Sequence, residues 1–203
     1  MADVTSRRTT FAARLLAGQR CVLLAVGDSL TAGYMVSEGY VEKAARTLRG
    51  FPGGPRMELA VRGECGDTAQ GGLARLKTAL KSCFPDLVLF QFGLNDCYSG
   101  VPVKQFFGSV VAAVRAVKGV NPSGDVVLVP PPPLPNRYDD ALAEPFREAL
   151  VQAESEGALV APVVATWRAF TGNAPLFLAD GVHPTGEGYR LMAEAVVKVI
   201  MGE

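Results

Sequence analysis

Four short polar segments of the chain contain the residue types that nucleophilic catalysis requires. Each follows an apolar run, and they cover residues 27–30, 63–68, 93–96 and 180–184. Between them they supply a hydroxyl, an imidazole, a carboxylate and several amide donors. Acyl transfer through a covalent intermediate uses this set of groups. If the fold brings the segments together, they can form one site.

The chemistry of three residues predicts their roles in such a site. Ser29 is inert as a free hydroxyl and needs a base within hydrogen-bond distance. His183 is the only histidine in the chain. Asp180 lies three residues earlier, so in a tight turn its carboxylate could fix the imidazole tautomer through Nδ1 and stabilise the imidazolium. We therefore predict a catalytic triad of Ser29, His183 and Asp180.

Several other catalytic motifs are absent from the sequence. There is no G-x-x-x-x-G-K-[ST] loop, no G-x-G-x-x-G, no H-E-x-x-H and no G-x-S-x-G. Nucleotide chemistry therefore loses its usual sequence support. A single histidine also argues against a zinc site built from several His and Cys ligands. We predict an enzyme that needs neither a metal ion nor a cofactor.

Apolar runs that could be strands recur along the chain, at residues 21–26, 57–61, 87–92, 126–129 and 158–163. The runs CVLLAV and DLVLFQF are apolar without alternation, which is typical of central parallel strands covered on both faces. Between the runs lie helix-like stretches at 38–49, 72–81, 104–118, 139–156 and 187–199. Strictly alternating strands and helices predict an α/β domain with an open, doubly wound parallel sheet.

The domain is expected to cover residues 20–203 without an internal boundary, because 203 residues is an ordinary length for one domain and no linker interrupts the chain. Residues 1–19 form an N-terminal extension for which we predict a helix with Phe11, Leu15 and Leu16 facing inward. The extension only loosely resembles a mitochondrial transit peptide. After the fourth strand, PPPPLPNR from Pro130 predicts a stiff extended loop.

The four polar segments resemble the conserved blocks of the SGNH hydrolases, the GDSL esterase/lipase family. The matches, in order, are GDSL at 27–30, Gly66 within CGDT, GLND at 93–96 and DGVH at 180–183. The resemblance implies a flavodoxin-like three-layer α/β/α sandwich with five strands in the order 2-1-3-4-5. It also implies an oxyanion hole formed by the backbone N–H groups of Ser29 and Gly66 and the side-chain amide of Asn95.

Taken singly, each of these residues has a structural alternative. Ser29 could be a helix N-cap, Asn95 a turn residue and His183 a structural histidine. Their joint order after successive strands favours catalysis instead. Three further acidic residues of these segments are interpreted as loop-ordering groups that bind backbone amides: Asp28, Asp67 and Asp96.

Charge and cysteine content bound the partners and the compartment. Twenty basic and twenty acidic side chains give no net charge, so we expect no nucleic-acid partner, and no apolar run is long enough for membrane insertion. Without a C-x-x-C pair, the four cysteines are interpreted as buried free thiols in the cytoplasm, with a mitochondrial location as the alternative. Cys65 and Cys97 adjoin site residues, so a redox-sensitive thiol is a minor hypothesis. The oligomeric state is left open.

The function predicted from the sequence is a serine esterase acting on a small-molecule ester with a short or medium acyl chain. The rim loops expected at 30–37, 97–103, 130–137 and 171–179 are short and leave the site open, with Tyr34, Tyr98 and Phe177 as candidate apolar walls. Alternatives with the same triad are a lysophospholipase, a thioesterase, a carbohydrate O-deacetylase and an acyltransferase. An alternative of another class is an inactive ligand-binding module.

Overall fold

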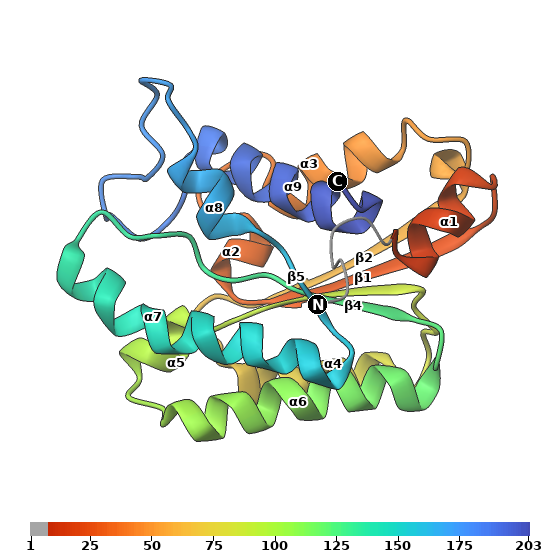
Figure 1. Cartoon of the computed structure of the whole chain (residues 1–203), viewed down its shortest axis with the longest axis horizontal. Helices are drawn as coiled ribbons and strands as arrows, with labels where there is room; N and C mark the ends of the chain where they lie inside the picture. Colours follow the sequence, from red (N-terminus) through yellow and green to blue (C-terminus); the bar gives the residue numbers. More distant parts are fainter. Residues whose placement is uncertain (1–7) are drawn as a thin grey trace, which may run out of the picture.

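A parallel five-stranded sheet forms the middle layer of the computed structural model, which describes residues 8–203 (Figure 1). Its strands are β1 (Cys21–Gly27), β2 (Met57–Gly63), β3 (Leu87–Gln91), β4 (Asp125–Leu128) and β5 (Leu159–Val160). All neighbouring pairs are parallel, and the order is β2-β1-β3-β4-β5. This confirms the predicted α/β class and the strand order that the family resemblance implied.

Helices cover both faces of the sheet, as the alternating pattern predicted (Figure 1). On one face lie α1 (Thr10–Leu16), α2 (Ser29–Ala32), α3 (Tyr40–Leu48), α8 (Val163–Arg168) and α9 (Gly186–Met201). On the other lie α4 (Ala69–Ala79), α5 (Leu94–Tyr98), α6 (Val103–Val120) and α7 (Arg137–Gln152). Two short 3-10 helices are also present: η1 (Gly54–Arg56) precedes β2, and η2 (Ala153–Glu156) follows α7. The result is a three-layer sandwich.

Successive residues of the central strands point into opposite halves of the core. In β1, Leu23 and Ala25 pack with α1, α3 and α9, whereas Leu24 and Val26 pack with α4, α6 and α7. Side chains of a strand point alternately to opposite faces, so one continuous apolar run fills both layers. This is why CVLLAV lacks a polar residue at every second position.

Two sequence expectations need correction at the edges of the elements. The fifth strand was expected at 158–163 but has two residues, because Pro162 has no N–H for the ladder and Val163 already begins α8. Parts of the expected rim loops at 30–37 and 97–103 are helical, in α2, α5 and the start of α6. Four or five residues are too few to show helical periodicity in a sequence.

Helix α1 lies within the predicted N-terminal extension and packs into the core. Phe11 and Leu15 are fully buried and Leu16 is partly buried, as their spacing predicted. Thr9 caps the helix by accepting from the Ala12 N–H at 3.0 Å. Residues 1–7 of the extension lie outside the described part of the chain.

The carboxyl ends of β1, β2 and β3 place three of the four polar segments on one edge of the sheet, whereas the fourth, at 180–184, follows α8 and not a strand, which corrects the order expected from the sequence. There β1 runs directly into α2, β2 into the loop 64–68, and β3 into Gly93 and α5. The last segment precedes α9. Open α/β sheets bind their ligands at this edge. Within residues 8–203, no helix is long and apolar enough to cross a membrane.

Candidate active site

Ser29 is the first residue of α2, immediately after β1. Asp28 is the N-cap, and its Oδ1 accepts from the Leu30 N–H at 2.9 Å. The alternative in which Ser29 caps the helix is therefore wrong. A Cβ on Gly27 would lie 2.0 Å from Thr31 Oγ1, so the strand-to-helix turn requires a residue without a side chain. This turn leaves the Ser29 hydroxyl to interact with another part of the chain.

A continuous hydrogen-bonded line joins Ser29, His183 and Asp180. The Ser29 Oγ lies 3.0 Å from His183 Nε2, and His183 Nδ1 lies 2.7 Å from Asp180 Oδ2. Ser29 and His183 are 154 residues apart in sequence, so the fold alone makes this contact. The structure thus brings together the three residues selected from the sequence, at distances suited to proton transfer.

The turn at residues 180–183 fixes the carboxylate next to the imidazole. Asp180 Oδ1 accepts from the backbone N–H groups of Val182 and His183, each at 2.9 Å. Burial acts to raise the pKa of Asp180, but these two N–H groups and the His183 ring outweigh it and lower the pKa to about 2. Asp180 is therefore ionised near neutral pH and can stabilise a charged imidazole.

An aromatic ring lies against the imidazole. The ring centroids of Tyr34 and His183 are 4.3 Å apart with an interplanar angle of 39°. The Tyr34 N–H donates to the Ser29 carbonyl at 3.1 Å, which holds the tyrosine close to the turn at α2. Tyr34 and Phe177 were both predicted as apolar walls of the site. Tyr34 lies against the imidazole, whereas Phe177 packs on Trp167, with ring centroids 5.1 Å apart. Tyr98 is partly exposed on α5.

Gly66 lies at the tip of a tight turn after β2. The Asp67 N–H donates to the Glu64 carbonyl at 3.3 Å, and Gly66 has φ of +78°. A positive φ at the third position of a turn favours glycine. Neither the Gly66 N–H nor the Ser29 N–H has a hydrogen-bond acceptor among residues 8–203. Both donors thus remain open to a bound molecule.

Asn95 lies in α5, beyond the end of β3. Its Nδ2 donates to the Asp67 carbonyl at 3.0 Å, which joins α5 to the Gly66 turn. A primary amide carries two N–H bonds, so this contact leaves the second one free. All residues predicted for the oxyanion hole thus come from segments that follow β1, β2 and β3 at the same edge of the sheet.

The three acidic residues interpreted as loop-ordering groups do bind backbone amides. Asp28 accepts from Leu30 as described, and Asp67 Oδ1 accepts from the Thr68 N–H at 2.8 Å. Both carboxylate oxygens of Asp96 lie 3.1 Å from the Ala69 nitrogen at the start of α4. Burial raises the pKa of Asp28 to about 7 and that of Asp96 to about 6.

Gln91 is a positioning residue that the sequence reasoning missed. It is fully buried at the end of β3, where its Nε2 donates to Asp28 Oδ2 at 3.2 Å and its Oε1 accepts from Thr31 Oγ1 at 3.1 Å. It thereby ties the turn at α2 to the neighbouring strand. A single amide inside the apolar run LVLFQF is the signal that could have identified it.

The cysteine prediction needs a correction in burial. All four are free, but only Cys21 is buried; Cys83 and Cys97 are intermediate and Cys65 is exposed. Cys65 was interpreted as a buried thiol, yet it lies exposed in the Gly66 turn. Burial raises the pKa of the Cys97 thiol, which disfavours the reactive thiolate there. Among residues 8–203, no group of three or more His, Cys, Asp or Glu could hold a metal ion.

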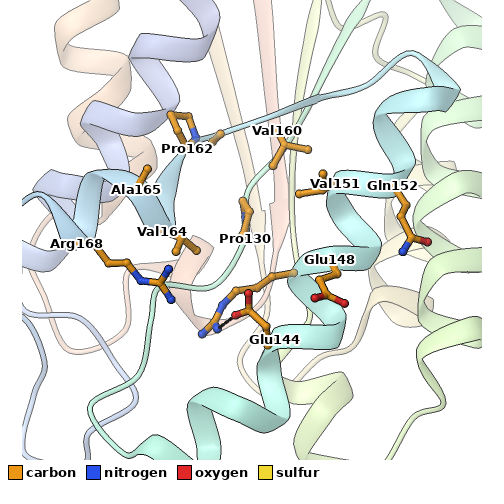
Figure 2. Close-up of a pocket in the computed structure, with 12 residues that line it drawn as sticks. Pro130, Glu144, Glu148, Val151, Gln152, Val160, Pro162, Val164, Ala165 and Arg168 are labelled. Atoms are coloured by element: carbon orange, nitrogen blue, oxygen red, sulfur yellow. Dashed lines mark hydrogen bonds and ion pairs between the residues drawn. The ribbon is translucent and has the colours of Figure 1, made fainter.

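A separate hollow of about 560 Å³ lies at the β5 edge of the sheet (Figure 2). Helix α7 forms one wall with Glu148 and Val151, and α8 forms the other with Val164 and Arg168. None of the residues of the Ser29, His183 and Asp180 line contributes to its lining. Its walls are mainly aliphatic.

Comparison with known proteins identifies the family. The family model of the GDSL-like lipase/acylhydrolase family matches residues 25–191. The chain belongs to this family. The match includes all four polar segments, and it confirms the resemblance inferred from them and the prediction of a GDSL-type ester hydrolase.

Relatives and solved structures of this GDSL family member cover most of its length. An arylesterase of Vibrio mimicus is 29% identical over 192 residues, which is 88% of each chain. The thioesterase 1/protease 1/lysophospholipase L1 of Escherichia coli is 27% identical over 177 residues, covering 87% of this chain and 81% of the relative. A crystal structure of TesA superposes with a TM-score of 0.74 at 26% identity, covering 88% and 97%.

Proposed function

We propose that this GDSL family member is a serine esterase that forms an acyl-enzyme on Ser29. One observation carries the proposal, namely the unbroken line from Ser29 Oγ to His183 Nε2 at 3.0 Å and from His183 Nδ1 to Asp180 at 2.7 Å. A nucleophile, a base and a group that orients the base are thus in contact. The family provides independent support for acyl chemistry.

Acylation follows from this geometry. Ser29 Oγ attacks the ester carbonyl carbon while His183 Nε2 takes the hydroxyl proton, and Asp180 stabilises the imidazolium. As the tetrahedral intermediate collapses, the bond to the alcohol oxygen breaks and His183 returns the proton to the leaving alcohol. A water molecule, deprotonated by the same nitrogen, then attacks the acyl-enzyme and releases the acid. Ser29 regains its proton in the last step.

Three donors are proposed to stabilise the oxyanion of both intermediates. They are the unpaired N–H groups of Ser29 and Gly66 and the free N–H of the Asn95 amide. Donors held in place before the reaction need no reorganisation as the charge develops, so each contributes substantially to the rate. The acceptor-free state of the two backbone groups supports this role.

Esters with short or medium acyl chains are the proposed substrates. The connections from α2 to α3 (residues 33–39) and from β4 to α7 (residues 129–136) are short, as expected, whereas that from α8 to α9 (residues 169–185), which carries Asp180 and His183, is longer than the sequence predicted. Partly or largely exposed apolar side chains lie close in sequence to site residues, at Tyr34, Met35 and Tyr98. These three side chains can cover a few methylene groups of an acyl chain, which supports short and medium chains.

Thioester or lysophospholipid hydrolysis is the second candidate. The Escherichia coli relative named thioesterase 1/protease 1/lysophospholipase L1 supports it. Hydrolysis of the same acyl group from an oxygen ester, a thioester and a lysophospholipid would rank the three leaving groups.

A cytoplasmic location stays part of the proposal. The four cysteines are free in the structure. Unpaired cysteines are typical of reducing compartments. Cell fractionation of the source organism would test the assignment.

The test of the function is hydrolysis of p-nitrophenyl esters from acetate to laurate by the purified protein and by its Ser29→Ala variant. We expect turnover by the wild type, with the best kcat/KM at or below the medium chains, and a loss of at least about 10³-fold in the variant. Turnover that the variant retains would contradict a role for Ser29. A wild type that is inactive and also unreactive toward a fluorophosphonate would favour the binding-module alternative.

A further inference from the structure

Arg75 in α4 binds both of the loops that flank the proposed oxyanion hole. Its Nη2 donates to the Gly27 carbonyl at 2.9 Å, at the end of β1, two residues before Ser29. Its Nη1 donates to Glu64 Oε2 at 2.6 Å and forms an ion pair, without hydrogen-bond geometry, with Asp67 Oδ2 at 2.5 Å. Glu64 and Asp67 are the two ends of the turn that presents Gly66. One guanidinium therefore spans the nucleophile strand and the Gly66 turn.

The contact between Arg75 and Asp67 also reaches Asn95. The Asp67 carbonyl accepts the Asn95 amide at 3.0 Å, while the Asp67 carboxylate faces Arg75. A shift of Asp67 would consequently displace two proposed oxyanion donors, the Gly66 N–H and the Asn95 amide. Asp67 is thus the link between the guanidinium and the donors.

The sequence leaves space on α4 for this arrangement. Gly71 and Arg75 are four residues apart, so they lie on the same face of the helix. A Cβ on Gly71 would lie 2.0 Å from Asp67 Oδ1. The carboxylate can therefore rest against the helix only because residue 71 has no side chain.

The two acidic partners of Arg75 differ in their exposure. The Glu64 side chain is 66% exposed and the Asp67 side chain 18% exposed. Exposed ion pairs contribute little, because water screens them and because ordering two long side chains costs entropy. The contact with Asp67 should therefore hold the turn, and the contact with Glu64 should add little.

We propose that Arg75 is the positioning residue of the oxyanion hole, a role that rests on the proposed esterase function. Its planar guanidinium offers several N–H donors in fixed directions, so one side chain can bind a carbonyl and a carboxylate together. Arg75 touches no reacting atom and acts through Asp67 and Gly27. A misplacement of about 1 Å in a reacting or stabilising group can lower the rate about 10²-fold. Loss of the Arg75 contacts is expected to act in this way, by displacing the oxyanion donors.

The test compares Arg75→Ala with Arg115→Ala. Arg115 is a suitable control because it binds a carboxylate, that of Glu156, on the exposed face of α6. For a p-nitrophenyl ester, we expect Arg75→Ala to lower kcat about 10- to 100-fold and to change KM by less than about threefold. Affinity for a trifluoromethyl ketone, which forms a tetrahedral adduct with serine, should fall in parallel with kcat/KM. Added methylguanidinium should restore part of the activity of Arg75→Ala only.

Three further variants keep the test decisive if Arg75→Ala does not fold. Gly71→Ala retains every charge but removes the space for the Asp67 carboxylate, so it should lower kcat with little change in KM. Arg75→Lys keeps one charge without the planar fork and should retain part of the activity. Glu64→Gln should remain within about threefold of the wild type.

Each outcome decides the proposal. Wild-type kcat and wild-type ketone affinity in folded Arg75→Ala, or in folded Gly71→Ala, would overturn it. A loss of activity that follows the loss of folded protein, without rescue by methylguanidinium, would also overturn it, because a merely structural role predicts that result. If the wild type neither hydrolyses esters nor reacts with a fluorophosphonate, the proposed function itself fails, and that failure is visible before any Arg75 variant is made.

Discussion

The edge of the sheet that carries Ser29, Gly66 and His183, called the catalytic edge below, differs from the hollow at the β5 edge. The difference lies in what the polar groups of each contact. At the catalytic edge, the Ser29 and Gly66 N–H groups have no acceptor among residues 8–203, and the Ser29 hydroxyl faces an oriented imidazole. At the β5 edge, the buried Arg147 donates to the carbonyls of Pro131 and Pro132 and pairs with two carboxylates. The guanidinium of Arg147 is therefore already paired within the protein.

This difference shows that the size of a hollow does not indicate where the reaction takes place. The β5 hollow is large enough for a small ligand and is mostly aliphatic. Its lining nevertheless contains no serine, cysteine or histidine, so it lacks the nucleophile and imidazole base that the catalytic edge combines. A serine that faces an oriented histidine is therefore the better guide to function in this fold, and substitutions at the two edges should differ accordingly.

The largest expected effect at the catalytic edge is that of His183→Ala. Removing the only imidazole takes away the base for Ser29, so kcat should fall by at least about 10³-fold. Steady-state hydrolysis of a p-nitrophenyl ester measures this loss. An unchanged kcat would show that the hydrogen bond to Ser29 has no catalytic role.

Asn95→Ala should have the next largest effect. It removes one proposed oxyanion donor and its anchor on the Asp67 carbonyl, so a fall in kcat of about 10²- to 10³-fold is expected. Asn121→Ala is the matched control, because Asn121 binds the Pro85 carbonyl away from the four polar segments. Equal activities of the two variants would contradict the oxyanion role.

Tyr34→Leu should lower kcat by about two- to tenfold. The variant keeps an apolar side chain but loses the ring that lies 4.3 Å from the imidazole, and aromatic pairs contribute about 0.5 to 1.5 kcal/mol beyond their buried area. Tyr138→Leu, which alters an exposed tyrosine of α7, serves as the control. If both variants retain wild-type kcat, the contact with His183 does not support catalysis.

The buried carboxyl of Asp28 should make stability depend on pH. Its pKa rises to about 7 on burial, from 3.8, so between these values the folded state holds more protons than the unfolded state. Stability should therefore decrease as pH rises from about 4 to about 7, by an amount on the order of a few kcal/mol. Asp28→Asn should remove this part of the slope. Denaturant unfolding of both proteins at pH 5 and pH 8 measures it, and identical slopes would contradict the assignment.

The smallest effect is expected at the β5 hollow. Val151→Lys places a charge on its exposed wall, 53% exposed in the wild type, without touching the catalytic edge. We expect unchanged kcat/KM and a stability within about 0.5 kcal/mol of the wild type. A large loss of activity would show that the β5 hollow affects catalysis and that the two edges are not independent.

The sequence predicted most of what depends on local pattern. The unbroken apolar runs predicted β1 and β3, and the order of the polar segments predicted that Ser29 and His183 would meet. Short helices such as α2 and α5 lay below the length at which periodicity is visible. The fifth strand was overextended because the effect of Pro162 on the ladder was not considered.

Contacts between distant segments could not be predicted in the same way. Arg75 reaches Gly27 across 48 residues, and Gln91 reaches Asp28 across 63. Neither residue belongs to a motif, and their roles arise only when the strands are placed side by side. The exposure of Cys65 likewise follows from the Gly66 turn.

The central claim is that the fold activates Ser29 as a nucleophile. Its most direct test is the mass of the intact protein after reaction with a fluorophosphonate, followed by peptide mapping. We predict one adduct per chain, located on Ser29, and none in the Ser29→Ala and His183→Ala variants. The absence of an adduct on the folded wild type, or an adduct on another residue, would contradict the account.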